Sequence, residues 1–451
     1  MDKRETSRNR ISGIAAVLFL TCCGQHLSAQ SEVLTLDDAV RLALNHNLAI
    51  QKSVVSASAF DHAIAAAKTQ RLPQFTFSST TGMLLTKPTI SFERGTFGEY
   101  PGIGPIPDTR TEITSPRRPT VVLSAEAALP LTQRIRIGLN IRQMEVRRKL
   151  ALEDVRLARQ DVVKQVRQTY YAILQSQSSL DAVEQTLTLL RDLSRQTGQY
   201  VRTGSAIEGD LLSVDARLAQ AEYDKIALLG PLATQKEELN HLLGRPIETT
   251  FRVTPVVEAN WIPELSQARE RAVVLRPELA QARLKVQQAN LDRRKKKTES
   301  IPDVSLTATY YSAINVSSTL PRNVAIAGVH TSWEPFDWGR KRNELAQLTK
   351  TEEEAQLAVR DIENRIRIEV GSAHRKLQEA RLLLSASRAS QQSAREAARL
   401  ASVRYQNGAA LLTNVLESQA SVADANDRVQ KALAAYWSAR AEIEKAMGEE
   451  Q

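Results

Sequence analysis

A seven-residue repeat of apolar positions runs through the last third of the chain. Charged residues occupy the other faces, and the repeat is formed by Val359, Ile362, Ile366, Val370, Ala373, Leu377, Ala380 and Leu384. A seam of this period predicts a long helix that packs lengthwise against other helices, as in a coiled coil. The fold class that it favours is mixed but mainly α.

Prolines delimit the long helices. None occurs in 131–230 or after Pro335, and a proline inside a helix costs about 3 kcal/mol. We therefore expect long helices over 134–200 and 339–405. Each is expected to end in a glycine turn and to fold back through a second helix, with the turns at Gly204 and Gly408 and the returning helices ending near Gly244 and Gly448.

Apolar and polar residues alternate in the segments that precede each long helix. Val304, Leu306 and Ala308, for example, are interleaved with serine and threonine. Strands of about ten residues with one apolar and one polar face have the length and pattern of an outer-membrane barrel. An ordinary soluble sheet is the alternative, but the helical tracts leave little sequence to cover it. The strands are expected at 72–84, 119–131, 302–316 and 322–336.

Four strands cannot close a membrane barrel, whose smallest form has about eight. An open sheet edge is not tolerated in lipid, because each unpaired backbone group costs several kcal/mol. If these strands span a membrane, several chains must contribute to one barrel. Two chains would give about eight strands and a lumen filled by side chains, whereas three would give about twelve and a pore.

The two halves of the chain carry the same features. Tyr200 and Tyr405 head the two glycine turns at a separation of 205 positions, and the strand-closing Pro130 and Pro335 are separated by the same 205. A repeat of this length is too long for a solenoid unit. We expect a first helix–strand–strand–helix–helix repeat over 30–244, a linker or equatorial segment over 245–263, and a second repeat over 264–451.

The segment 1–29 has the order of a secretory signal peptide: a basic start, an apolar run and a short polar end. Cleavage after Ala29 is expected, so that the mature chain begins at Gln30. Lipoprotein processing at Cys22 or Cys23 is the alternative. If cleavage follows Ala29, no cysteine remains for a disulfide, a thiolate catalyst or a metal site.

Composition and motifs argue against an enzyme. Aromatic residues make up only 5% of the chain and the mean hydropathy is −0.31, values that suit long helices with narrow apolar seams. No HxxxH, HExxH or phosphate-loop motif occurs, so we expect no catalytic residue, no cofactor and no metal. The histidines His46, His62, His241 and His374 are expected on helix surfaces. The net charge is +9, but nucleic acid is not expected as a partner of an exported chain.

Two further segments have particular interpretations. The basic run 293–297 is either a solvated helix end or a basic collar that faces anionic lipid head groups. The segment 84–119 is rich in proline, glycine and charge, which predicts a long loop, external on a barrel.

Several segments resemble the TolC family of outer-membrane efflux proteins. LTLDDAVRLALNHNLAIQKS resembles the opening helix of that family, and LRPELAQARLKVQQAN resembles its second-repeat counterpart. LPQF, EPFDWGRKRNELAQ and the two tyrosine–glycine turns complete the pattern in the same order. The resemblance implies a homotrimer with one twelve-stranded barrel in the outer membrane, in contact with its lipid. A coiled-coil α-helical barrel would continue it as a tunnel across the periplasm.

The resemblance also implies function and partners. It indicates a passive channel-tunnel for efflux or type I secretion, which docks a periplasmic adaptor protein coupled to an inner-membrane pump. The alternative is an exported structural coiled-coil protein of the envelope without transport activity. The turns marked by Tyr200, Gly204 and Gly408 are the expected docking tips for the adaptor.

A periplasmic gate is the remaining expectation from the resemblance. Tyr405 matches a gate tyrosine of the family, and Asp210 and Glu417 match acidic gate positions. Asn414 carries an amide where the family has an acid, and Ala410 stands where it has a basic residue. We therefore expect Glu417 to form the principal acidic ring. The alternatives are helix-end packing for Tyr405 and a solvated helix face for Glu417.

Overall fold

The computed structural model describes residues 32–83, 85–87, 89–114, 119–256, 262–315 and 321–449. The expected signal peptide, the two cysteines and the expected mature start at Gln30 lie outside the described residues.

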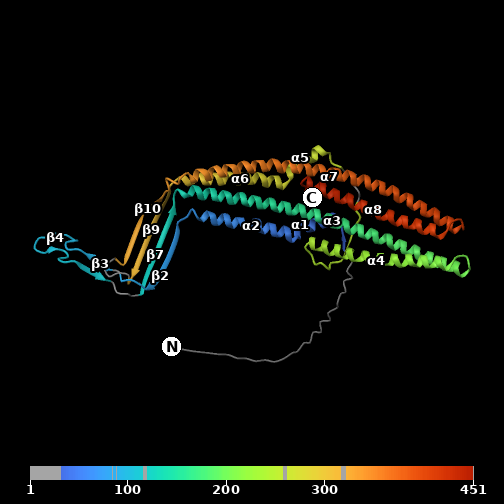
Figure 1. Cartoon of the computed structure of the whole chain (residues 1–451), viewed down its shortest axis with the longest axis horizontal. Coiled ribbons are helices and arrows are strands. Elements are labelled where there is room, and N and C mark those ends of the chain that lie inside the picture. Colours follow the sequence, from blue (N-terminus) through green and yellow to red (C-terminus); the bar gives the residue numbers. More distant parts are fainter. Residues whose placement is uncertain are drawn as a thin grey trace, which may run out of the picture.

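Long antiparallel helices form a rod, and a four-stranded sheet lies at one end of it (Figure 1). The longest helices are α3 (Gln133–Arg202) and α7 (Arg340–Gln406), which confirms the lengths predicted from the proline-free tracts. The expected class, mainly α with four strands, is confirmed as well. The other helices are α1 (Leu36–His46), α2 (Leu48–Thr69), α4 (Glu208–Leu242), α5 (Leu265–Leu275), α6 (Pro277–Lys297), the 3-10 turn η1 (Thr298–Ser300) and α8 (Leu412–Ala446).

The sheet is antiparallel, with the strand order β10-β9-β7-β2. Its strands match the four predicted ones within a few residues. The fourth strand ends at Ser332, before the expected position 336. Pro335 lies between these two positions and has no N–H to donate to a ladder. The strands are β2 (Gln74–Met83), β7 (Pro119–Pro130), β9 (Asp303–Ile314) and β10 (Asn323–Ser332).

The strand register sorts the side chains onto two unlike faces. Phe77, Ala125 and Tyr310 are cross-strand partners and share one face, whereas the adjacent row pairs Glu126 with a threonine on either side. Because side chains alternate along a strand, these two rows set the character of both faces. One face carries Phe75, Phe77, Leu123, Leu129, Leu306, Tyr310 and Val329. The other carries mainly serine and threonine, together with Gln74, Glu126, Asp303 and His330 and a few apolar residues such as Val324 and Ile326.

The described part of the segment between β2 and β7 contains strands, whereas its composition predicted a long loop. It contains two small antiparallel ladders at the end of the sheet remote from the helices (Figure 1). Apolar contacts hold them, including Phe92 and Phe97, whose ring centroids are 5.2 Å apart. Proline and glycine content indicated turns correctly but did not reveal these pairings. The strands are β3 (Thr89–Phe92), β4 (Glu99–Tyr100), β5 (Gly104–Pro105) and β6 (Thr111–Thr114).

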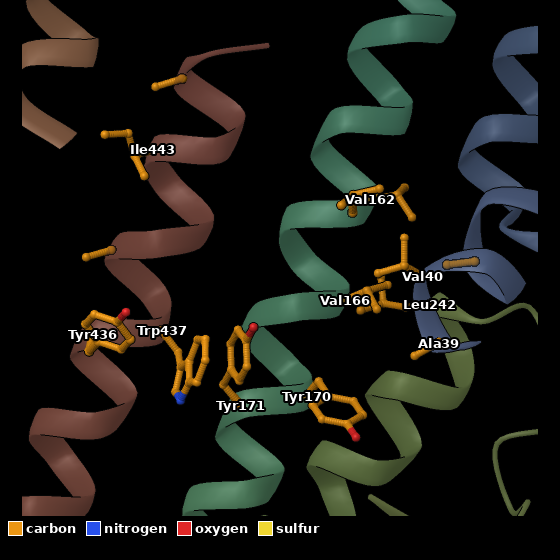
Figure 2. Packing of buried hydrophobic residues seen from close by; sticks show 14 of the residues in the cluster. Ala39, Val40, Val162, Val166, Tyr170, Tyr171, Leu242, Tyr436, Trp437 and Ile443 are labelled. Atoms are coloured by element: carbon orange, nitrogen blue, oxygen red, sulfur yellow. The ribbon is translucent and has the colours of Figure 1, made fainter. Parts of the chain in front are cut away.

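The main core lies midway along the rod, where α3 meets α8 and the short helices. Figure 2 shows Tyr171 of α3 facing Trp437 of α8, and their rings stack at 4.8 Å with an interplanar angle of 13°. The coiled-coil seam predicted for α7 is confirmed by this packing. Its members Ile366, Val370, Ala373, Leu377, Ala380 and Leu384 are buried, and Val359 and Ile362 are half-buried against the same core.

A short belt crosses the rod at this level. β1 (Glu32–Leu34) pairs in parallel with β8 (Phe251–Val253) of the expected equatorial segment. The fully buried Tyr170 fastens it to α3, because its hydroxyl accepts a hydrogen bond from the Thr254 N–H at 3.0 Å. The same hydroxyl lies 2.9 Å from the carbonyl oxygens of Leu34 and Thr254, to which it can donate.

One histidine differs from the sequence-based expectation. His46, His62 and His241 are exposed, as expected, but His374 is buried at 8% exposure. Its Nε2 lies 3.1 Å from the carbonyl oxygen of Pro263, in the equatorial segment. The contact spans 111 positions, so the helical pattern around His374 could not reveal it.

Candidate functional site

The two helix-turn-helix tips lie at the end of the rod remote from the sheet (Figure 1). Two backbone hydrogen bonds close the α3–α4 turn. The Ser205 N–H donates to the Tyr200 carbonyl at 2.8 Å, and the Gly204 N–H donates to the Val201 carbonyl at 3.1 Å. This is the Schellman arrangement, which requires a residue with positive φ after the helix end. Gly204 provides it, with φ of 73°.

The α7–α8 turn repeats this geometry. The Ala409 N–H donates to the Arg404 carbonyl at 2.8 Å, the Gly408 N–H donates to the Tyr405 carbonyl at 3.0 Å, and Gly408 has φ of 67°. A Cβ at either glycine would meet nothing within 4 Å. Glycine is therefore favoured at both positions by the positive φ of the turn and not by a lack of space for a side chain. The two glycines thus occupy equivalent positions in equivalent turns, whereas the tyrosines are offset by one residue: Tyr200 corresponds to Arg404, and Tyr405 to Val201.

A satellite cluster, here called the tip cluster, joins the two hairpins near their ends. Its buried members come from α3, α4 and α8: Leu187, Leu190, Leu193, Val214, Ala221, Leu412 and Leu416. Tyr405 of α7 packs against it while remaining partly exposed. Packing between the hairpins is incomplete, since a hollow of about 190 Å³ lies between α3 and the α7–α8 hairpin, beside Tyr405 and Val415. The two tips of one chain are therefore in contact but not tightly fitted.

The structure brings three of the expected tip residues together. Partial burial raises the pKa of the Tyr405 hydroxyl above its usual value, and the electrostatic influence of Tyr200 and Asp210 adds to this effect. The side chain of Thr197 opposes it, although the buried Thr197 Oγ1 makes no well-aligned hydrogen bond. Tyr405 of one hairpin therefore lies within electrostatic reach of Tyr200 and Asp210 in the other.

Asn414 and Glu417 lie apart from that group. Both are exposed on α8, whereas Leu412, Val415 and Leu416 between and beside them are buried in the opposite direction. Residues three apart on a helix share a face, so the amide and the carboxylate project side by side. Among the described residues, the Glu417 carboxylate has no ion-pair partner. Its charge is available to the surroundings of the tip.

Arg217 is a tip residue that the sequence reading missed. Its Nη1 donates to the Leu416 carbonyl at 3.1 Å, which ties α4 to α8 one residue before Glu417. Arg217 follows Asp210 by seven residues, and this spacing returns to nearly the same helix face. That spacing could have indicated that Arg217 lies on the same side of α4 as Asp210. It could not indicate that Arg217 binds the Leu416 carbonyl of the other hairpin.

Within the described part of the chain, no group of histidine, cysteine, aspartate and glutamate side chains could hold a metal ion. No described helix combines the length and the apolarity needed to cross a membrane.

Comparison with known families identifies the chain. The family model described as outer membrane efflux protein matches residues 39–245 and 268–449, which together cover most of the sequence. The chain belongs to the outer membrane efflux protein family. The resemblance noted in the sequence is thereby confirmed. Membership places the protein in the outer membrane, as a channel of the efflux type with a helical part in the periplasm. A search of curated protein sequences finds no significant match.

Solved outer-membrane channels share the fold of this family member. CmeC of Campylobacter jejuni superimposes with a TM-score of 0.72 at 17% identity, over 92% of this chain and 85% of that one. VceC of Vibrio cholerae gives 0.70 at 15% identity, over 92% and 96%. The MtrE outer membrane channel of Neisseria gonorrhoeae, described in an open state, gives 0.69 at 14%, over 92% and 89%. At these identities the likeness concerns the fold, a helical tunnel with a β-domain.

Proposed function

We propose that three copies of this chain form one continuous conduit through the outer membrane and the periplasm. The two-faced sheet with unpaired edges is the observation that carries the proposal. Within the described part of the chain, β2 and β10 each have a neighbouring strand on one side only. Unpaired backbone groups cost several kcal/mol each in lipid, so β10 of one copy must pair with β2 of the next.

The character of the two faces supports a pore. Closure with the apolar face outward exposes the Phe75, Leu123 and Leu306 side to lipid and turns the serine- and threonine-rich side inward. Three chains give twelve strands, enough for a polar lumen. An exported structural coiled coil without transport activity would have no use for this lining, so that alternative is not favoured.

The tips are the proposed partner surface. Both turns end the rod on the side away from the membrane-spanning sheet (Figure 1), where Tyr200, Gly204 and Gly408 would meet a periplasmic adaptor protein coupled to an inner-membrane pump. We further propose that the chain is a passive conduit for efflux or type I secretion, without catalysis or cofactor. Its organisation would be two repeats, 30–244 and 264–451, joined by the segment 245–263.

Conductance and mass test the proposal together. The protein purified in mild detergent should have the mass of three chains, and it should produce step-like ion currents when inserted into planar lipid bilayers. A trimer that inserts without conducting would support the structural alternative. A monomer or dimer with full strand content would contradict the closure argument.

The proposed gate makes a separate prediction about ion selectivity. Threefold symmetry would bring three Glu417 carboxylates toward the axis, where low-dielectric walls focus their potential. Glu417→Gln should therefore lower the cation-over-anion permeability ratio and weaken block by multivalent cations, with trimer stability unchanged. Reversal potentials of single channels in a salt gradient measure this ratio.

Two matched variants control this measurement. Glu417→Asp keeps the charge and should keep the selectivity. Asn414→Asp adds a carboxylate on the same helix face and should raise the cation preference. If Glu417→Gln and Asn414→Asp both leave the reversal potential unchanged, this face of α8 does not line the entrance.

A further inference from the structure

A basic hollow lies where the helical rod joins the sheet. Its volume is about 890 Å³, and it lies between the end of α2, the first turns of α3, the end of α6 and the start of α7. Six cationic side chains line it and no carboxylate does: Arg71, Arg134, Arg142, Arg293, Arg294 and Lys297. Three hydroxyl side chains and several aliphatic ones complete the lining. Such a wall suits a ligand with a negative head and an apolar body.

Most of this positive charge is not neutralised within the described part of the chain. Arg293 pairs with Glu352 at 2.7 Å. The five other cations have no ion-pair partner among the described residues. The neighbouring Lys296 differs, since Glu299 and Glu344 hold its ammonium group at 2.7 and 2.5 Å. Carboxylates are thus placed beside the hollow but not in it.

Helix dipoles explain only part of the cluster. Arg294 and Lys297 lie in the last turn of α6, where cations are stabilised by the negative end of the helix. Arg134 is the second residue of α3, at the positive end of that helix, where a cation is disfavoured. An anion bound in the hollow would compensate this unfavourable placement.

One wall of the hollow is turned away from the polar face of the sheet. Asp303 lies on the polar face of β9, in the alternating row that includes Ser305 and Thr307, and Arg136 of α3 reaches it with an ion pair of 3.0 Å. At about 100° per residue, Arg134 and Gly138 project roughly 160° away from Arg136. Both line the hollow. Its α3 lining therefore points mainly away from the side on which Arg136 reaches the polar face of the sheet.

The hollow also lies at the level of the membrane surface. Its lining includes Ser300 and Ile301, which directly precede β9. Exposed aromatic side chains follow β10 at the same end of the sheet: Trp333, Phe336 and Trp338 are 58%, 68% and 89% exposed. Tryptophan and other aromatic residues concentrate at the head-group level of membrane proteins. Basic groups at that level meet lipid phosphates.

We propose that this hollow binds the phosphate head group of an anionic phospholipid in the periplasmic leaflet of the outer membrane. Arg134, Arg294 and Lys297 hold the phosphate, and Ile135, Ile301 and Leu345 contact the first part of the acyl chains. Each chain carries one such site, at the junction that couples the barrel to the tunnel. The inference rests on the outer-membrane location of the protein and on the proposed trimer, but not on its transport activity.

Native mass spectrometry of the intact trimer tests the site with defined lipids. Phosphatidylglycerol and phosphatidylcholine are added separately to the detergent-solubilised protein, and retained lipids are counted. The wild-type trimer should bind up to three phosphatidylglycerol molecules in preference to phosphatidylcholine. The triple variant Arg134→Gln, Arg294→Gln and Lys297→Gln should weaken phosphatidylglycerol binding by about 100-fold at low salt, because each basic group near an anionic surface contributes roughly a factor of five.

Two control variants distinguish lipid binding in the hollow from a general effect of the protein's positive charge. The variant Lys52→Gln, Arg360→Gln and Arg381→Gln removes the same charge from exposed positions of α2 and α7 and should bind like the wild type. Arg134→Lys with Arg294→Lys keeps the charge and should retain at least a tenth of the affinity, which checks that the site tolerates substitution.

Three results would overturn the proposal. Equal retention of the two lipids by the wild type is one, and equal loss in both triple variants is another. The third is competition by millimolar inorganic phosphate as effective as that by phosphatidylglycerol, which would indicate a site for a soluble anion. None of these results bears on conductance, so failure here is distinct from failure of the channel proposal.

Discussion

Gly244→Ala is expected to be among the most destabilising single substitutions in the chain. Gly244 ends the α4 hairpin with φ of 67°, and a Cβ there would overlap the carbonyl oxygen of His46 and lie 2.7 Å from its carbonyl carbon. The left-handed backbone alone costs about 1–2 kcal/mol for a residue with a Cβ, and forced overlap in a packed site adds about 1–3 kcal/mol. Gly448→Ala should behave similarly, since its Cβ would lie 2.9 Å from the Leu275 Cβ.

Both glycines have the same structural task. α1 and α2 are separated by a break at Asn47, and α5 and α6 by a break at Arg276. The end of each returning helix fits against one of these breaks. Asn47 Nδ2 donates to the Leu242 carbonyl at 2.8 Å, and Arg276 reaches the Ala446 carbonyl at 3.4 Å. A side chain at the glycine would push these ends apart.

Substitutions at two other glycines distinguish the cost of a left-handed backbone from the cost of Cβ overlap. Gly204→Ala introduces the strained backbone without overlap, since nothing lies within 4 Å, and should cost only about 1–2 kcal/mol. Gly198→Ala lies inside α3 with an ordinary contact at 4.0 Å and should be neutral or stabilising by up to about 1 kcal/mol. Thermal unfolding of the purified trimers, followed by circular dichroism, should rank them Gly198→Ala, Gly204→Ala, Gly244→Ala in falling stability. Equal melting of the last two would contradict the overlap argument.

Glu444→Gln is expected to destabilise the mid-rod core by about 3 kcal/mol. This is the low end of the range for removal of one partner of a buried ion pair. Glu444 is 8% exposed, and its carboxylate accepts hydrogen bonds from both Arg167 and Arg440, the latter at 3.0 Å. Arg440 also lies over the Trp437 ring at 5.3 Å. Without the carboxylate, two guanidinium groups would face each other beside the stacked Tyr171 and Trp437.

Glu442→Gln is the matched control for this substitution. Glu442 lies on the same helix and pairs with Lys376 at 3.1 Å, but the two side chains are 31% and 59% exposed. Exposed pairs contribute about 1 kcal/mol or less. Melting of both variants in the same detergent measures the difference. A Glu444→Gln protein as stable as Glu442→Gln would show that the buried carboxylate adds nothing to the folded state.

Local periodicity was enough to define the long helices and the strands. The seam from Val359 to Leu384 predicted which side of α7 is buried, because a helix returns to the same face every seven residues whatever it packs against. Alternation from Val304 to Tyr310 predicted two unlike sheet faces for the same kind of reason. The turns at Gly204 and Gly408 followed from glycine's unique tolerance of positive φ.

Contacts between distant segments could not be obtained in this way. The burial of His374 against Pro263, the hydrogen bond from Arg217 to Leu416 and the pairings of the inserted ladders depend on where separate elements meet. The basic run 293–297 looked the same in sequence whether it was a solvated helix end or a collar. Only the approach of Arg71, from the turn after α2, and of Arg134, from α3, made it one wall of a hollow.

The sequence by itself thus determined the elements, since each depends on the spacing of residues along one helix or strand. It also revealed the repeat, and it favoured a membrane sheet because the long helical tracts leave little sequence to cover a soluble one. Tertiary structure alone decided the shared role of Gly244 and Gly448, the grouping of Tyr405 with Tyr200 and Asp210, and the gathering of basic side chains around the hollow. These features depend on the relative rotation and depth of helices that lie far apart in the chain. Packing across the whole core sets that rotation, and no local pattern encodes it.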